Sequence, residues 1–264
     1  MQTLIKYPGS KWNIAEWIIK YFPQHKVYVE PFFGSGSVFF TKRPSYIEVI
    51  NDIDGDVVNL FKVCREHPDE LAQMLELTPY SRDEYNNCRK IEGDDIERAR
   101  RTVVRYYQTF GASTSINNTW KCSQTKNSPR NPELWRRLPQ VVFEVCDRLK
   151  NAHIENCNAL DLIAKNNRQE TLLYLDPPYL LNLRKHRLYK NEISDSIHIE
   201  LLKLIKNSKA QVILSAYDSE LYNSELKSWN TAEINTTAQF GIHRKEKIYF
   251  NFDIGLFALE VNRL

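Results

Sequence analysis

This 264-residue chain lacks the features that mark membrane, secreted and metal-binding proteins. No apolar run reaches the roughly 18 residues that a membrane-spanning helix needs, and Met1 to Lys6 starts no secretory signal. The five cysteines are odd in number and include no Cys-x-x-Cys pair, so neither a disulfide framework nor a zinc site is expected. We therefore expect a cytoplasmic protein with reduced thiols, no membrane association and no metal.

The net charge of +3 is small, but it is unevenly distributed. The stretch from Arg98 to Arg137 contains nine basic residues and one acid, Glu133, a balance of +8 that leaves −5 for the rest of the chain. Basic side chains mixed with aromatic ones are typical of surfaces that contact nucleic-acid phosphates and bases. The alternative for Arg98 to Arg105 is a solvated basic helix. The aromatic residues of this stretch are Tyr106, Tyr107, Phe110, Trp120 and Trp135.

The segment that best indicates chemistry is Asp176-Pro177-Pro178-Tyr179, which follows the apolar run Leu172 to Leu175. The run predicts a buried strand, and the two prolines end it in a rigid loop because they lack N–H donors. At the carboxyl end of a strand in an open α/β sheet, such a loop lies where ligands bind. The Asp176 carboxylate and the Pro177 carbonyl are both acceptors, suited to the two hydrogens of an exocyclic amino group. Tyr179 offers a face on which a planar base can stack.

Two upstream segments predict a second binding site. Lys6 to Lys11 contains a Pro-Gly turn before a helix expected from near Ser10, and a helix N-terminus offers free N–H groups to an anion. Glu30 to Ser37 follows the short strand Val27 to Glu30, and its glycines allow close backbone approach to a ligand before a helix from about Ser37. A second strand, Tyr46 to Asp52, ends in an acid that can accept hydrogen bonds from ribose hydroxyls.

These three motifs, in this order along the chain, resemble those of the Dam-type adenine-N6 DNA methyltransferases of the alpha group. The likeness covers about the first 65 and the last 115 residues. It implies catalytic roles for Asp176, Pro177, Pro178 and Tyr179, with S-adenosylmethionine as cofactor and double-stranded DNA as partner. The cofactor-binding residues that it implies are Tyr7, Pro8, Gly9, Ser10, Lys11, Glu30, Pro31, Phe32, Gly34, Gly36, Ser37, Asp52, Asp161 and Asp176.

Asp161 has two interpretations. The segment His153 to Leu162 resembles the part of the family that packs beside the adenine of the cofactor, where Asp161 would bond the adenine amino group. Alternatively, Asp161 caps a helix from Leu162 to Asn166.

DNA contacts are expected from the resemblance and from the basic stretch. The family places a DNA-contacting lysine where Lys6 stands. The basic stretch adds Lys121, Lys126, Arg130, Arg136 and Arg137 as candidates, because arginines beside the turn-rich segment around Pro129 and Pro132 could reach base edges in the major groove. The basic connection from Leu180 to Ser194 is long enough to close over DNA.

The expected fold is α/β: a Rossmann-like, mixed and mostly parallel methyltransferase-type sheet with helices on both faces. Residues 1–65 and 151–264 would form the catalytic, cofactor-binding domain, and residues 66–150 a small, mainly helical target-recognition insertion. Helical patterns occur in the insertion at Asp69 to Leu75, Arg82 to Arg89, Ile96 to Tyr107 and Arg136 to Lys150. After the catalytic loop, the pattern predicts a helix at Ile197 to Ile205, a strand at Gln211 to Leu214 with a strand-end loop at Ser215 to Asp218, and antiparallel strands at Lys247 to Phe252 and Leu256 to Val261.

The predicted reaction is site-specific methyl transfer to N6 of an adenine that is flipped out of the duplex. The absence of any Pro-Cys dipeptide disfavours cytosine-5 methylation. Cytosine-N4 methylation uses the same geometry and stays open, as does a catalytically silent DNA-binding protein on the same fold. The middle of the chain lacks a close match to the recognition hairpin of the Dam group, so methylation of GATC is not implied. Whether a cognate restriction endonuclease accompanies the chain is also open.

Overall fold

The computed structural model describes residues 3–90, 92–110, 119–122, 131–180, 189, 191–237 and 243–253. Within these residues, seven strands form one sheet in the order β3-β2-β1-β4-β5-β7-β6. The first five strands in this order are parallel, and β7 runs antiparallel to both β5 and β6. This mixed sheet confirms the expected fold class. The strands are β1 (Val27–Glu30), β2 (Ile47–Asn51), β3 (Ala152–Glu155), β4 (Thr171–Leu175), β5 (Gln211–Ala216), β6 (Asn230–Thr237) and β7 (His243–Phe250).

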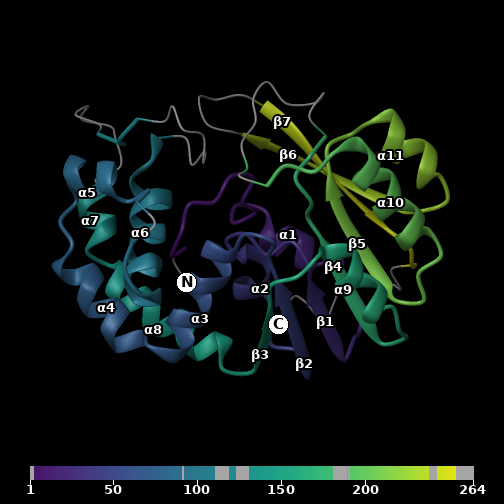
Figure 1. Cartoon of the computed structure of the whole chain (residues 1–264). Helices are drawn as coiled ribbons and strands as arrows, with labels where there is room; N and C mark the ends of the chain where they lie inside the picture. Colours follow the sequence, from purple (N-terminus) through teal and green to yellow (C-terminus); the bar gives the residue numbers. More distant parts are fainter. Residues whose placement is uncertain are drawn as a thin grey trace.

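Helices cover both faces of the sheet, as Figure 1 shows. Strand β4 is buried along its whole length, and its side chains alternate between two hydrophobic clusters. Leu172 and Tyr174 belong to the cluster on one face, whereas Leu173 and Leu175 belong to the cluster on the other. A strand covered on both faces reads as a continuous apolar run, which explains the pattern seen in the sequence. The helices flanking the sheet are α1 (Ala15–Ile19), α2 (Ser37–Thr41) and α3 (Gly55–Glu66) on one side, and α9 (Ala159–Lys165), α10 (Asp195–Lys206) and α11 (Glu220–Glu225) on the other.

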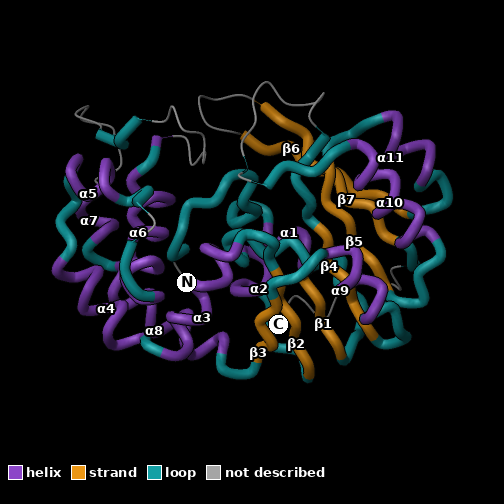
Figure 2. Tube along the Cα trace, viewed as in Figure 1, coloured by secondary structure: helices purple, strands orange, loops and turns teal. Residues whose placement is uncertain are grey.

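Five further helices lie beyond α3, away from the sheet (Figure 2). In α6 the buried residues Ala99, Val103, Tyr106 and Tyr107 recur with the spacing of one helix face. These side chains belong to the same hydrophobic cluster as residues from the sheet. The region expected to be an insertion therefore shares a continuous core with the region that carries the sheet. The five helices are α4 (Pro68–Leu77), α5 (Arg82–Asn87), α6 (Asp95–Gln108), α7 (Asn131–Trp135) and α8 (Leu138–Leu149).

Several local predictions were wrong. The helix expected from near Ser10 begins at Ala15, because Ser10 and Lys11 are tied to the loop after β1: the Ser10 and Ser35 hydroxyls lie 2.8 Å apart, and the Lys11 N–H donates to Ser37 Oγ. The Asn158 side chain, not that of Asp161, caps α9. Strands β3 and β6 and helices α7 and α11 were not predicted. The expected strand Leu256 to Val261 lies outside the described residues.

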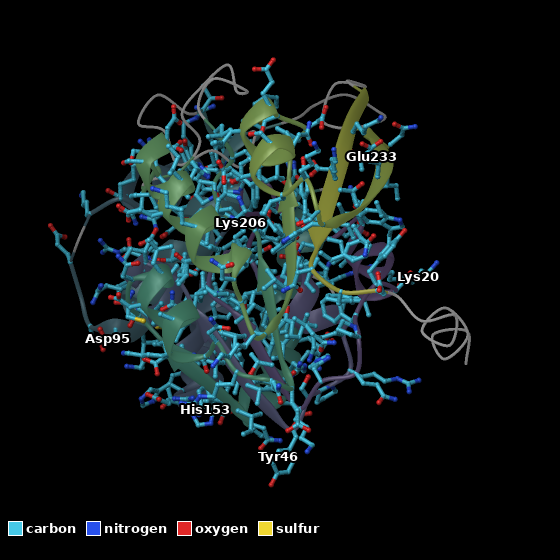
Figure 3. The ribbon with its side chains drawn as sticks, turned by 90° about the vertical axis from the view of Figure 1, so that its right-hand side faces the viewer. Lys20, Tyr46, Asp95, His153, Lys206 and Glu233 are labelled. Atoms are coloured by element: carbon cyan, nitrogen blue, oxygen red, sulfur yellow. The ribbon has the colours of Figure 1, made fainter. Side chains whose placement is uncertain are left out.

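The sheet has an amino end, where its parallel strands begin, and a carboxyl end, where they stop. Tyr46, just before β2, and His153 of β3 lie near one end, while Glu233 of β6 lies near the opposite end (Figure 3). The loops that follow β1, β2 and β4 leave the sheet at its carboxyl end. Among the described helices, none has the length and apolar character needed to cross a membrane.

Candidate active site

A cavity of about 230 Å³ lies at the carboxyl ends of β1, β2 and β4. Strand β1 is hydrogen-bonded to β2 on one side and to β4 on the other, so the loops after these strands meet at one place. The strand order reverses between β1 and β4, and in open α/β sheets ligands bind at such a point. The position of the cavity therefore follows from the topology.

The cavity brings together most residues of the three sequence motifs, although the motifs are far apart in the chain. Pro178 of the catalytic motif also lines it. The predicted cofactor residues that line it are Tyr7, Pro8, Gly9, Ser10, Glu30, Pro31, Phe32, Gly34, Ser37, Asp52 and Asp176.

Three predicted cofactor residues are not among the cavity-lining residues. Lys11 is buried beside the cavity and contacts Asp176. Gly36 has a left-handed backbone and forms the start of α2. Asp161 is exposed in the first turn of α9. The structure therefore gives Gly36 a role in the turn and leaves Asp161 outside the cavity wall.

Gly34 allows the β1 loop to pass under an aromatic ring. Its φ is +51°, and a Cβ atom there would lie 2.9 Å from the Tyr7 ring. Tyr7 packs in turn on Tyr106 of α6, with ring centroids 5.2 Å apart. Any larger residue at Gly34 would both strain the backbone and displace Tyr7 from the cavity wall.

Asp52 lies at the end of β2 and is almost fully buried. Its Oδ2 accepts a hydrogen bond from the Gly34 N–H at 2.8 Å, and its Oδ1 accepts one from the Asp54 N–H at 2.9 Å. Burial raises the pKa of Asp52 to about 6, against the opposing effect of these backbone donors. The carboxylate thus fixes the glycine loop while it faces the cavity.

Glu30, at the end of β1, is also buried against the cavity. Its Oε2 accepts a hydrogen bond from the Tyr28 hydroxyl at 2.6 Å. Burial raises the pKa of Glu30 to about 8, and the nearby Asp176 carboxylate acts in the same direction. The side chain is therefore mostly protonated at pH 7, and a cation brought into the cavity would favour its ionised form.

Asp176, whose side chain is 18% exposed, forms an ion pair with the buried Lys11. The Lys11 Nζ lies 2.9 Å from Asp176 Oδ2 and also donates to the Gly9 carbonyl at 2.7 Å. Burial raises the pKa of Asp176 to about 6, although the Lys11 charge opposes this. The pKa of Lys11 is raised, because Asp176 and Glu246 outweigh the effect of burial. The sequence assigned Lys11 to the cofactor, whereas the structure places its ammonium on Asp176, the acid predicted to be catalytic.

Tyr179 is buried, with 8% of its surface exposed, and is not among the residues that line the cavity. Its hydroxyl donates to Glu246 Oε2 at 2.8 Å. Its ring meets Tyr217 edge to face, with centroids 4.3 Å apart, and the Lys11 Nζ lies 4.8 Å from the ring centroid. In this structure the ammonium of Lys11 thus contacts both groups, Asp176 and Tyr179, that the sequence assigned to a target base.

Sequence reasoning missed several cavity residues. Ile53 follows Asp52 and is 57% exposed in the cavity wall, and Leu160 of α9 is a second apolar wall residue. Tyr189 lines the cavity and donates from its hydroxyl to the Pro8 carbonyl at 3.2 Å. An exposed apolar residue directly after a strand-end acid could have indicated Ile53. No local pattern indicates Tyr189. It lies in the connection from Leu180 to Ser194, which was assigned from the sequence to DNA rather than to the cavity.

The predicted DNA-binding residues have different surroundings. Lys6 lies beside Lys121, and its Nζ is 4.2 Å from the centroid of the Tyr107 ring. Burial, and then the Lys121 charge, lower the pKa of Lys6 to about 8. Arg136 and Arg137 are exposed between α7 and α8. Lys126 and Arg130, like most of the basic connection Arg184 to Lys190, lie outside the described residues.

The helical half of the basic stretch is engaged within the protein. Arg98 and Arg105 pair with Asp56 of α3, at 3.5 and 3.2 Å. Arg100 and Arg101 pair with Glu97 at 2.6 Å, and Arg100 also pairs with Glu84. The charges of these arginines are therefore balanced by carboxylates of α3, α5 and α6 itself, and their contact with DNA stays a prediction.

Comparison with known proteins gives a consistent result. The family model for D12 class N6 adenine-specific DNA methyltransferases matches residues 7–249. The chain is 22% identical to the type II methyltransferase M1.LlaDCHI of Lactococcus lactis subsp. cremoris, covering 91% of this chain and 90% of that one. It is 33% identical to the DNA adenine methylase of Escherichia coli K12, covering 67% and 65%, and 22% identical to that of Salmonella typhi, covering 83% and 82%. The chain belongs to the D12 class of N6 adenine-specific DNA methyltransferases.

Proposed function

We propose that the chain transfers a methyl group from S-adenosylmethionine to N6 of an adenine flipped out of double-stranded DNA. The observation that carries this proposal is the meeting of Glu30, Asp52 and Asp176 in one cavity at the carboxyl ends of neighbouring strands. Family membership supports adenine, rather than cytosine N4, as the target.

The residues of the cavity fit the proposed cofactor. Ile53 and Leu160 offer apolar surface for an adenine ring, and Asp52 offers carboxylate oxygens to ribose hydroxyls. Glu30 and Asp176 place two carboxyl groups around the part that would hold the cationic methionine end. When bound, S-adenosylmethionine supplies a methyl group that is already a strong electrophile.

The protein groups would act on the amine of the target base. The Asp176 carboxylate and the Pro177 carbonyl accept its two hydrogens, which turns the nitrogen lone pair out of conjugation with the ring. For this, the amino group must replace the Lys11 ammonium on Asp176, where Nζ now lies 2.9 Å away. The energy of flipping a base, a few kcal/mol, is offset in part by stacking on Tyr179, worth about 1–3 kcal/mol.

We further propose that residues 66–150 carry target recognition, with Lys6 and Lys121 forming one phosphate contact. Two neighbouring ammonium groups, one with a lowered pKa, form a site that an anion would stabilise. Changing either lysine to Ala should reduce the salt slope of DNA binding by about one and weaken all sequences alike. Arg136 and Arg137 are the described candidates for reaching base edges.

The test is methylation by the purified protein. DNA from a host without adenine methylation would be incubated with radiolabelled S-adenosylmethionine, and modified positions would be read by single-molecule sequencing. We expect N6-methyladenine at one short sequence motif. N4-methylcytosine, or DNA binding without transfer at saturating cofactor, would overturn the proposal. The same sequencing identifies the recognition motif. Two of the relatives above are named DNA adenine methylase and one is named type II methyltransferase. The motif can then be used to ask whether an endonuclease accompanies the protein. Co-expression of adjacent genes would show whether one of them cleaves unmodified copies of the motif.

A further inference from the structure

Tyr179 is anchored at its hydroxyl end as well as by its loop. The residue follows two prolines in a segment without regular pairing. Its hydroxyl donates to Glu246 Oε2 at 2.8 Å, and its ring packs edge to face on Tyr217. The neighbours of the ring restrict where it lies, and the hydrogen bond to Glu246 fixes the position of its hydroxyl end.

Glu246 itself lies on a rigid element. It belongs to β7, which is hydrogen-bonded to β5 on one side and to β6 on the other, and it pairs in register with Ile234 of β6. The next residue, Lys247, pairs with Ala216, where β5 ends. Glu246 therefore lies at the level where β5 stops, at the same end of the sheet as the loop of Asp176.

The charges around this contact keep the Tyr179 hydroxyl a donor. Burial, followed by the nearby Asp176 and Glu246 carboxylates, raises the pKa of Tyr179 well above its usual value. The phenol thus stays neutral, while Glu246 offers it a carboxylate oxygen. The 2.8 Å contact to Glu246 Oε2 therefore joins the far end of the ring to strand β7.

We propose that Glu246 is a positioning residue for methyl transfer: it fixes the hydroxyl end of the Tyr179 ring, so that the ring face that now meets the Lys11 ammonium can receive the flipped adenine once that ammonium is displaced. The proposal rests on the proposed function, in which Tyr179 receives the base. Glu246 acts through Tyr179 and needs no contact with DNA or cofactor. Residues of the last strands of the sheet would therefore enter the active site, although none belongs to the sequence motifs.

The test is a double-mutant cycle of Tyr179→Phe and Glu246→Ala, which remove the two ends of one hydrogen bond. Each change should raise the KM for DNA and lower kcat/KM about tenfold, while the affinity for a cofactor analogue stays unchanged. The double variant should be no worse than either single variant, because both remove the same interaction. Glu246→Gln, which keeps an acceptor oxygen, should restore most of the rate. Independent effects that multiply in the double variant would overturn the proposal.

A spectroscopic readout separates positioning from a general structural defect. DNA with 2-aminopurine at the target position fluoresces strongly when the base is flipped and unstacked, and less when it stacks on an aromatic ring. Glu246→Ala should brighten the bound duplex relative to the wild type, and Glu246→Gln should not. Glu233→Ala is the matched control, since Glu233 lies on the neighbouring strand β6 and pairs with Lys245.

The outcomes also distinguish this proposal from the proposed function. If Tyr179→Ala leaves transfer unchanged, Tyr179 does not receive the base, and the proposed function fails with respect to that residue. If Tyr179→Ala impairs transfer but Tyr179→Phe and Glu246→Ala do not, only the positioning role is overturned. If Glu246→Gln is as impaired as Glu246→Ala while Tyr179→Phe is active, Glu246 acts through its charge on Lys11 and Asp176, which also overturns it. Should Glu246→Ala fail to fold in a thermal melt, the Gln and Phe variants alone decide.

Discussion

Two buried clusters, each with a lysine and a carboxylate, differ in how completely their groups are satisfied. Glu48 of β2, 1% exposed, receives hydrogen bonds from Lys42 Nζ at 2.5 Å, from Arg148 at 2.5 and 2.8 Å, and from the Ser45 N–H at 3.0 Å. Its pKa is lowered, since Arg148 and Lys42 together outweigh the effect of burial. Asp176 has Lys11 as its ion-pair partner and the Glu246 carboxylate nearby, and burial raises its pKa to about 6.

The difference separates a cluster that stabilises the fold from one that suits the proposed reaction. The Glu48 cluster joins β2 to the end of α2 and to α8, and it contributes stability that is present above the unfolded pKa of Glu and is lost as the pH falls through the lower folded pKa. At Asp176 stability changes with pH in the opposite direction. The folded protein binds a proton at Asp176 more tightly than the unfolded chain does, so ionisation of Asp176 lowers the stability of the fold as the pH rises from about 4 to about 6. Among the described residues, Asp176 is held by Lys11 and Tyr179 only, whereas Glu48 has three different residues as donors, and Asp176 borders a cavity from which another donor could approach.

The largest effect on stability should come from Glu48→Gln. It leaves the buried Lys42 and Arg148 without a countercharge, and breaking a buried ion pair in this way costs about 3–5 kcal/mol. Urea unfolding monitored by circular dichroism measures it. Glu233→Gln, which breaks an exposed pair with Lys245, is the control and should change stability by less than about 1 kcal/mol. Equal effects of the two changes would contradict the stabilising role of the Glu48 cluster.

Asp176→Ala should lower kcat about 10²- to 10³-fold, or about 2.7–4 kcal/mol, because it removes one of the two acceptors for the amine. Single-turnover methylation measures this, and the binding of a cofactor analogue should be largely retained. A variant that keeps more than a tenth of the wild-type rate would contradict the assigned role. For the wild type, kcat/KM should fall as the pH is lowered through about 6, because Asp176 must be ionised.

Asp52→Ala tests a carboxylate that shares features of Glu48 and of Asp176. Like Glu48 it accepts hydrogen bonds from protein donors, here backbone N–H groups, and like Asp176 it faces the cavity. Loss of charge-assisted hydrogen bonds should weaken binding of S-adenosylmethionine by about 1.5–3 kcal/mol. Isothermal titration calorimetry measures the change. Unchanged affinity would mean that Asp52 serves only to hold the Gly34 and Asp54 N–H groups.

The smallest expected effect is the release of a proton from Glu30 when a cationic ligand binds. Because its pKa is raised to about 8, binding of a cationic ligand at pH 7 should release up to about one proton, and this release should fade as the pH rises above about 8. Calorimetry in buffers of different ionisation enthalpy measures it. Glu30→Gln should abolish the release. If the wild type released no proton, the cation would have to be held by other groups.

The sequence predicted the centre of the site better than its surroundings. Asp176, Glu30 and Asp52 could be found because each directly follows an apolar strand signal, and parallel strands bring their carboxyl ends together. The contacts Lys11 to Asp176 and Tyr179 to Glu246 could not, because they join segments whose spacing depends on the strand order. The local charge of +8 counted the arginines of α6 without their partners, since Asp56 and Glu84 lie outside the stretch from Arg98 to Arg137. Strand β6 was missed because its sequence, Asn230 to Thr237, is mostly polar along an edge of the sheet.

The strand order also constrains how the protein is made. The nascent chain emerges with its amino end first, so Glu30 and Asp52 leave the ribosome early, whereas Val27 of β1 must wait for Thr171 of β4 before it gains its second neighbour. Asp176 follows directly after that strand, and Glu246 comes later still. The cavity is therefore incomplete on a ribosome-bound amino-terminal half. The early strands must stay protected from aggregation until the second half of the chain has been translated.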